Sequence, residues 1–140
     1  MFEDLSLFTA DEALGADVAD VFNAITGRAR PGGFRKLLVG PWFLRDGILG
    51  EISRVTEAAE AGEKARIRIK VNSLSDPEMA EALYAASTAG AEVEIVTRGI
   101  CVLRPGVRGV SDRITVRSVL GRFLEHSRIF SFQAGDRVAT

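Results

Sequence analysis

The most regular pattern in the chain is an alternation of apolar and charged side chains over ARIRIKV, residues 65–71. The odd-numbered positions of this segment are apolar, whereas the even-numbered positions are Arg66, Arg68 and Lys70. Successive side chains of a β-strand point to opposite faces, so this period of two predicts a strand with one buried and one charged face.

Other segments follow the helical period. Ile48, Ile52 and Val55 recur at a spacing of three to four residues, which predicts a helix that buries one side. Asp76 precedes Pro77, and this pair is typical of a helix start. Together the patterns predict helices over 16–26, 45–61 and 77–88, and strands over 36–39, 65–71, 91–96, 114–119 and 128–132.

The alternation of strands and helices predicts an α/β fold with a mostly parallel or mixed sheet flanked by helices. At 140 residues, the chain has the length of a single domain, residues 1–140. If the strands over 65–71 and 91–96 pair, the basic face of the first lies beside Glu92 and Glu94. Both faces of a parallel sheet are normally covered, so we expect this polar face to meet another domain or solvent.

Composition argues against several classes of protein. Hydrophobic residues make up 46% and charged residues 26%, as in folded domains, and a net charge of −1 argues against a general nucleic-acid binder. The acidic amino terminus lacks the order of a signal peptide, and no apolar run reaches the roughly 20 residues of a membrane helix. We therefore expect no membrane insertion. Cys101 is the only cysteine, which suits the cytoplasm, and with one histidine it is too few for a structural zinc site.

Arginines dominate the segment from residue 98 to residue 128, where only Asp112 and Glu125 are acidic. The planar guanidinium group matches the oxygens of phosphate and carboxylate, and lysine is absent from the segment. A solvated positive surface without a ligand explains the same pattern, so both interpretations stay open. The seven arginines are Arg98, Arg104, Arg108, Arg113, Arg117, Arg122 and Arg128.

The only histidine, His126, lies in the same segment, within FLEHSRIF. Arg128 follows two residues later, and both a packed structural histidine and a phosphate-handling histidine fit this sequence. Arg98 stands just past a predicted strand end, where α/β sheets bind their ligands. The chain contains no phosphate-binding loop, dinucleotide fingerprint or serine nucleophile elbow.

A family resemblance is carried by the run VTRGICVLRPGVRGVSDRITVRSVLGRFLEHSRIF, which resembles the corresponding segment of bacterial polyphosphate kinases. The segments EDLSLFTAD, FRKLLVGPWFLRDGILGEI and KVNSLSDPEMAEALYAAS are similar to that family as well. The similarity runs in order over nearly the whole chain.

The resemblance implies an activity. Members of the family transfer the terminal phosphate of ATP reversibly to inorganic polyphosphate through a phosphohistidine intermediate. Two carboxyl-terminal domains that resemble phospholipase D form their nucleotide site together with Mg²⁺. This chain would then be a carboxyl-terminal catalytic-domain portion of such an enzyme, with the fold of one phospholipase D-like half.

The resemblance also implies site residues. The histidine of EHSR is similar to the family's second active-site histidine, which gives His126 a catalytic role in contact with the nucleotide's phosphates. Arg98 of RGIC is similar to a nucleotide-binding residue. Phe2 stands where the family usually has a nucleotide-binding tyrosine, so a ring could still stack but the hydroxyl donor is absent. The candidate phosphate contacts are Arg117, Arg122 and Arg128.

The implied ligands are ATP or ADP and inorganic polyphosphate. Mg²⁺ would be held mainly by the nucleotide and by parts of the enzyme outside this chain. The remaining domains of the same enzyme are the expected partners, and a homo-oligomer is a further expectation. The chain covers a minor fraction of a family member and lacks the region of the phosphorylated histidine. We therefore expect an excised domain that is inactive alone.

Two alternative functions stay open. The first is a non-catalytic module that binds polyphosphate or nucleotide through the arginine segment. The second is a phospholipase D-like phosphodiesterase or nuclease that works as a dimer. The second would need a histidine-x-lysine pattern with a downstream acid, whereas this chain has Arg128 in place of the lysine and only Asp136 in its tail.

Overall fold

The computed structural model describes residues 2–28 and 32–140, with the backbone alone for residues 2 and 3. These residues form two compact units, one of Ser6–Ile48 and the other of Leu49–Thr140 with the first five residues of the chain. The expectation of one domain over residues 1–140 stays a prediction.

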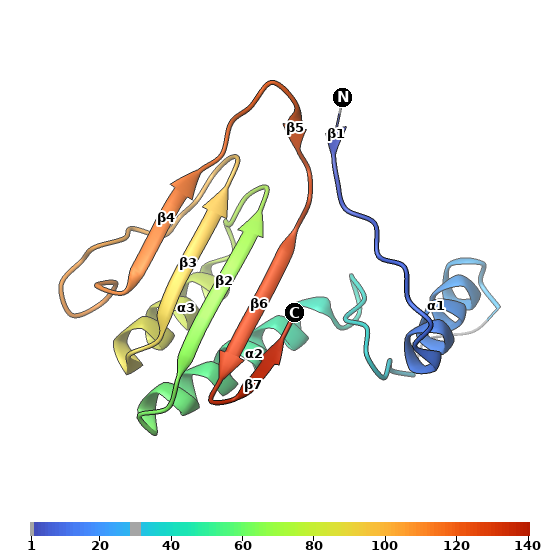
Figure 1. Ribbon diagram of the computed structural model, residues 1–140, viewed down its shortest axis with the longest axis horizontal. Coiled ribbons are helices and arrows are strands. Elements are labelled where there is room, and N and C mark those ends of the chain that lie inside the picture. Colours follow the sequence, from blue (N-terminus) through green and yellow to red (C-terminus); the bar gives the residue numbers. More distant parts are fainter. Residues whose placement is uncertain (1, 29–31) are drawn as a thin grey trace. The chain divides into compact units, whose positions relative to one another are not determined.

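A five-stranded mixed sheet forms the centre of the larger unit (Figure 1). Its strands, in spatial order, are β4 (Ile114–Ser118), β3 (Glu92–Thr97), β2 (Ala65–Val71), β6 (Ile129–Ala134) and β7 (Arg137–Ala139). The first three run parallel to one another, whereas β6 runs antiparallel to β2 and β7 antiparallel to β6. The predicted α/β class with a mixed sheet is therefore confirmed.

The connections explain these directions. Strands β2 and β3 are joined through the helix α3 (Pro77–Ala89), and a helical crossover of this kind returns the chain in the same direction. Strands β6 and β7 are joined by a tight turn in which Gly135 has a φ of 60°, a conformation that glycine adopts at little cost. The turn reverses the chain and makes this edge of the sheet antiparallel.

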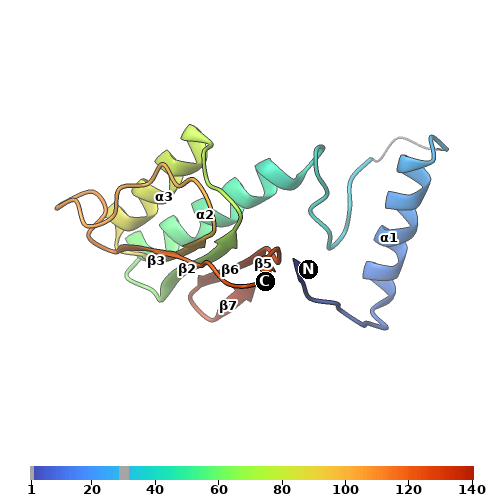
Figure 2. The ribbon, with the colours of Figure 1, turned by 90° about the horizontal axis from the view of Figure 1, so that it is seen from above.

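The core lies on one side of the sheet. Figure 2 shows α3 and the part of α2 (Leu44–Glu60) that belongs to this unit on the same face of the strands. Burial of a large aliphatic side chain contributes about 1.5–3 kcal/mol, so this layer dominates the stability of the unit. Its buried apolar side chains include Ile52, Val55, Ile67, Ile69, Leu83, Ala86, Val93, Ile95, Ile114 and Phe132.

The opposite face of the sheet carries charged side chains. Arg66 forms ion pairs with Glu92, at 3.5 Å, and with Glu94 on the neighbouring strand. Arg68 reaches the second oxygen of Glu94 at 3.3 Å. The predicted proximity of these basic and acidic residues is confirmed, because the parallel register pairs Arg66 with Glu92 and Arg68 with Glu94.

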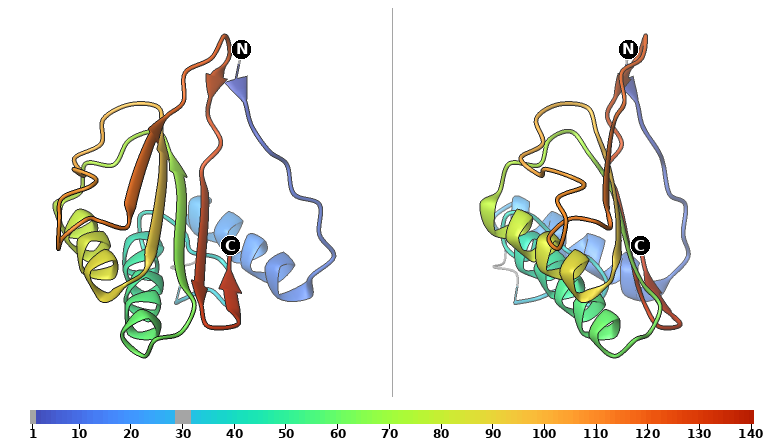
Figure 3. Two further views of the ribbon diagram at one scale, coloured as in Figure 1. Left: turned by 60° about the vertical axis from the view of Figure 1, so that its left-hand side comes forward. Right: turned by 90° about the vertical axis from the view of Figure 1, so that its left-hand side faces the viewer.

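Two further strands form a small sheet of their own, in which β1 (Phe2–Glu3) pairs in parallel with β5 (Leu124–Glu125). Figure 3 shows β1 beside β5, which is part of the connection that leads from β4 to β6. Sequence patterning did not predict β1, β5 or β7, because strands of two or three residues are too short to show a period of two.

The smaller unit contains α1 (Glu12–Ile25), whose amino terminus is capped by Asp11. Asp17 of this helix is fully buried and accepts hydrogen bonds from the backbone N–H groups of Arg35, Lys36 and Leu37, at 2.7–3.0 Å. The strand predicted over 36–39 is wrong for this reason, since these N–H groups bind a carboxylate instead of a neighbouring strand.

The three predicted helices are confirmed, with ends that differ by up to four residues. Four of the five predicted strands are also confirmed, and the strand over 65–71 has the predicted ends. Asp76 caps α3 as expected, because its side chain accepts a hydrogen bond from the N–H of Met79 at 3.1 Å. Within residues 2–28 and 32–140, no helix is long and apolar enough to cross a membrane.

Candidate active site around His126

The pairing of β1 with β5 determines the surroundings of His126. The parallel register places Phe2 opposite Leu124 and Glu3 opposite Glu125. The next residue of each segment continues this register, which brings Asp4 beside His126 although 122 residues separate them in the sequence. The Nδ1 atom of His126 lies 3.1 Å from Oδ2 of Asp4.

This contact determines which ring nitrogen carries the proton. An ionised carboxylate only accepts hydrogen bonds, so Nδ1 of His126 carries the hydrogen and donates it to Asp4. In the neutral ring, Nε2 is then the basic nitrogen. The hydrogen bond from His126, followed by one from the N–H of Leu5, holds the pKa of Asp4 below its ordinary value.

The residues next to His126 are held from the large sheet. Lys70, on the charged face of β2, donates to Oε2 of Glu125 at 2.6 Å and to Oγ of Ser127 at 2.5 Å. The Nη1 group of Arg98 donates to the backbone carbonyl of Glu125 at 3.2 Å. Strand β2, through Lys70, and the residue that follows β3, Arg98, therefore each contribute a cation that holds this segment.

Arg98 reaches this position because the ends of β2 and β3 lie close together. The N–H of Gly99 donates to the carbonyl of Asn72 at 2.7 Å, and Oγ1 of Thr97 donates to the same carbonyl at 3.2 Å. A Cβ atom at residue 99 would lie 2.9 Å from Oγ of Ser73 and 3.1 Å from the carbonyl oxygen of Asn72. Glycine at this position permits the close approach.

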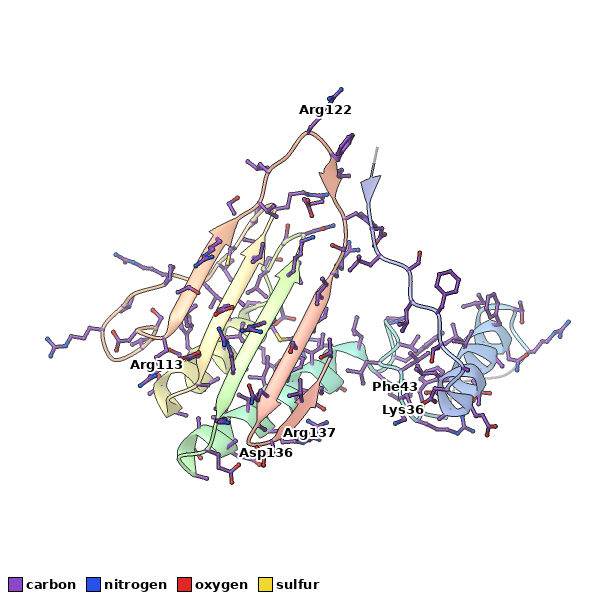
Figure 4. All side chains as sticks on the ribbon, viewed as in Figure 1. Lys36, Phe43, Arg113, Arg122, Asp136 and Arg137 are labelled. Carbon is purple, nitrogen blue, oxygen red and sulfur yellow. The ribbon has the colours of Figure 1, made fainter. Side chains whose placement is uncertain are left out.

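The remaining candidate arginines occupy different places. Arg128 is exposed two residues after His126, and its charge helps to lower the pKa of Asp4. Arg117 lies on β4, where its charge acts on Glu94 of the charged sheet face. Arg122 lies at the outer tip of the connection between β4 and β5, with its guanidinium 5.9 Å from the centre of the Phe123 ring (Figure 4).

The structure thus brings together His126, Arg98 and Arg128, and adds Asp4 to them. The catalytic role of His126, the nucleotide contact of Arg98 and the phosphate contacts of Arg117, Arg122 and Arg128 all stay predictions. Phe2 stays a predicted nucleotide contact as well, and its side chain lies outside the described residues.

Comparison with known proteins decides the family of the chain. The family model for polyphosphate kinase C-terminal domain 2 matches residues 37–139, which is most of the sequence. The chain belongs to the polyphosphate kinase family. The predicted resemblance is therefore confirmed.

Individual polyphosphate kinases support this assignment. The chain is 53% identical to the polyphosphate kinase of Mycolicibacterium gilvum over 136 residues, which cover 97% of this chain and 19% of that protein. It is 51% identical to the polyphosphate kinase of Streptomyces coelicolor, with 96% and 18% covered. The crystal structure of polyphosphate kinase from Porphyromonas gingivalis superposes with a TM-score of 0.83 at 34% identity, over 93% of this chain and 21% of that one. The chain thus spans about a fifth of the length of the polyphosphate kinases it matches.

Sequence reasoning missed two residues of the site, Asp4 and Lys70. Lys70 was predicted on the charged face of its strand, but nothing in the sequence indicated that the carboxyl end of this strand lies beside Glu125 and Ser127. Asp4 lies in the segment EDLSLFTAD that carries part of the resemblance to polyphosphate kinases. Its pairing with His126 depends on β1 and β5, which patterning could not detect.

The histidine, cysteine and acidic side chains of the described residues do not gather into a resident metal site. Within residues 2–28 and 32–140, no group of three or more histidine, cysteine, aspartate or glutamate side chains could hold a metal ion. The carboxylate of Asp4 already accepts a hydrogen bond from Nδ1 of His126. No step of the chemistry below is therefore assigned to a metal ion held by this chain.

Proposed function

We propose that this chain contributes part of the nucleotide site of a polyphosphate kinase, which transfers the terminal phosphate of ATP reversibly to inorganic polyphosphate. His126 is the proposed catalytic residue, and Arg98 and Arg128 are the proposed phosphate-binding cations. The observation that carries the proposal is the contact of Nδ1 of His126 with Asp4, beside a main chain that Arg98 holds at Glu125.

Phosphoryl transfer requires positive charge at fixed positions around the transferred phosphate group. The transition state of phosphoryl transfer spreads negative charge over the oxygens of the moving group, so catalysis consists largely of positioning and charge neutralisation. Asp4 keeps the proton on Nδ1, so Nε2 of His126 is the atom that accepts a hydrogen bond from a phosphate group or, in the imidazolium form, donates one. The guanidinium groups of Arg98 and Arg128 add positive charge and several N–H donors for phosphate oxygens.

The other parts of the reaction fall outside this chain in the proposal. The phosphohistidine intermediate is proposed to form on a histidine elsewhere in the enzyme, because the proposed role of His126, the only histidine here, is contact with the phosphates of the nucleotide. Mg²⁺ accompanies the phosphates of ATP, and the remaining domains of the enzyme complete the site. The chain alone is therefore proposed to bind ligands without completing the transfer.

Calorimetric titration tests this function. ATP and long-chain polyphosphate are titrated into the 140-residue chain with and without Mg²⁺, and the His126→Ala and Arg98→Ala variants are compared with Arg54→Ala. Arg54 is a suitable control because it pairs with Glu51 on α2, away from the His126 segment. Loss of about tenfold or more in affinity for the two site variants, with Arg54→Ala unchanged, supports the proposal. Wild-type binding that none of the three substitutions alters contradicts it.

A further inference from the structure

We propose that Lys70 is a positioning residue for His126. The inference rests on the proposed function, since it assigns a role within the same site. Lys70 donates to Glu125 at 2.6 Å and to Ser127 at 2.5 Å, and these are the two residues that flank His126 in the sequence. A single ammonium group thus fixes the chain on both sides of the histidine.

Burial distinguishes this contact from the other ion pairs of the sheet. The side chains of Lys70 and Glu125 are each 22% exposed, so water screens their interaction only in part. Arg68 lies two residues earlier on the same face of β2, but its side chain is 54% exposed and its partner is Glu94 of the neighbouring strand. Exposed pairs of this kind contribute little. Arg68 is therefore a matched control for Lys70.

The segment around His126 depends on such contacts because apolar packing around it is sparse. Strand β5 has only two residues, and within the described part of the chain its one partner strand is the equally short β1. Leu120, Phe123 and Leu124 of the preceding connection are all exposed. Few buried apolar side chains therefore hold the segment, and hydrogen bonds to its residues decide where it lies.

Asp4, Arg98 and Lys70 each hold a different part of the segment around His126. Asp4 holds the ring of His126 through Nδ1, and Arg98 holds the backbone carbonyl of Glu125. Lys70 holds the side chains on both sides, so its loss frees the backbone dihedral angles that aim the imidazole. Because the charge of Lys70 is matched by Glu125, we assign it a role through His126 and not a direct role on the phosphate.

The single histidine makes the test direct, since its ring gives one unambiguous set of NMR signals in the whole 140-residue chain. In Lys70→Met we expect the ring signal of His126 to move from its wild-type position, while it stays in place in Arg68→Met. Lys70→Arg keeps the charge and the donors, so it should return the signal toward the wild-type position. A merely structural role would leave the ring signal unchanged as long as the fold is intact.

A second readout separates this inference from the proposed function. Lys70→Met is expected to weaken ATP binding by about tenfold, with Arg68→Met unchanged. If the wild-type chain binds no ATP, the proposed function fails, whereas the ring signal of the unliganded chain still decides the role of Lys70. A Lys70→Met chain with intact circular dichroism and a wild-type ring signal overturns the inference.

If Lys70→Met does not fold, Glu125→Gln removes the same ion pair, and an unmoved ring signal in that variant overturns the inference as well.

Discussion

At the residue scale, the carboxylate of Asp4 sets the tautomer of the His126 ring. Asp4 accepts the hydrogen bond of Nδ1, so replacing it with alanine removes the reason for the proton to stay on that nitrogen. In Asp4→Ala we expect the ratio of the Nδ1–H to the Nε2–H form of the neutral ring to fall about fivefold, the effect of one ordinary hydrogen bond. The ¹⁵N shifts of the His126 ring in alkaline solution measure this ratio. An unchanged ratio would show that Asp4 does not set the tautomer.

A second prediction at this scale concerns Gly99. An added methyl group would meet Ser73 Oγ at 2.9 Å and the carbonyl oxygen of Asn72 at 3.1 Å, where the ends of β2 and β3 are joined by hydrogen bonds. We expect Gly99→Ala to push these ends apart, lower the free energy of unfolding by about 1–2 kcal/mol and displace Arg98 from Glu125. Urea unfolding measures the first effect and ATP titration the second. Gly50→Ala, at a site with open space around the added carbon, is the control.

At the scale of elements, hydrogen bonds to Asp17 connect α1 to the segment that follows it. Burial by itself raises the pKa of this carboxyl, but the hydrogen bonds from the N–H groups of Arg35, Lys36 and Leu37 and from the Arg35 guanidinium outweigh it, so the pKa lies well below its ordinary value. A carboxyl with a depressed pKa in the folded state stabilises the fold above its unfolded pKa, which is about 3.9. This contribution is lost as the pH falls below that value.

The consequence is a pH-dependent effect of mutation. Asp17→Asn should lower the melting temperature at pH 7 by roughly 5 °C or more, because four N–H donors lose an ionised acceptor. The difference from the wild type should shrink as the pH falls below about 4. Asp20→Asn is the control on the same helix, since the Asp20 side chain is 48% exposed and lies 3.3 Å from the Arg35 guanidinium. A difference between wild type and Asp17→Asn that does not depend on pH would contradict this account.

At the scale of the whole molecule, the sequence predicts the elements that have a period and misses those that have none. Strand β2 and the helices show clear apolar repeats, and the ion pairs between β2 and β3 are the ones expected if these two strands pair. The segment 36–39 is apolar enough to resemble a strand, but its N–H groups bind Asp17, a tertiary contact that local pattern does not encode.

The sequence likewise predicts only part of the candidate site. Family resemblance singles out His126 and Arg98, because they lie in long motifs of the chain. Asp4 and Lys70 act on the same segment from 122 and 56 residues away, as follows from their positions in the sequence. Contacts of this kind follow from strand register and cannot be derived from the order of residues along one strand.

The central claim is that the nucleotide binds at His126 and Arg98. The NMR signal of the His126 ring tests this claim most directly. Addition of ATP with Mg²⁺ to the 140-residue chain is predicted to shift the ring signal of His126 in a saturable way in the NMR spectrum. The same addition should shift it far less in Arg98→Ala. Saturable shifts elsewhere in the spectrum, with the His126 ring signal unmoved, would show that the nucleotide binds another surface and would contradict the assignment of this site.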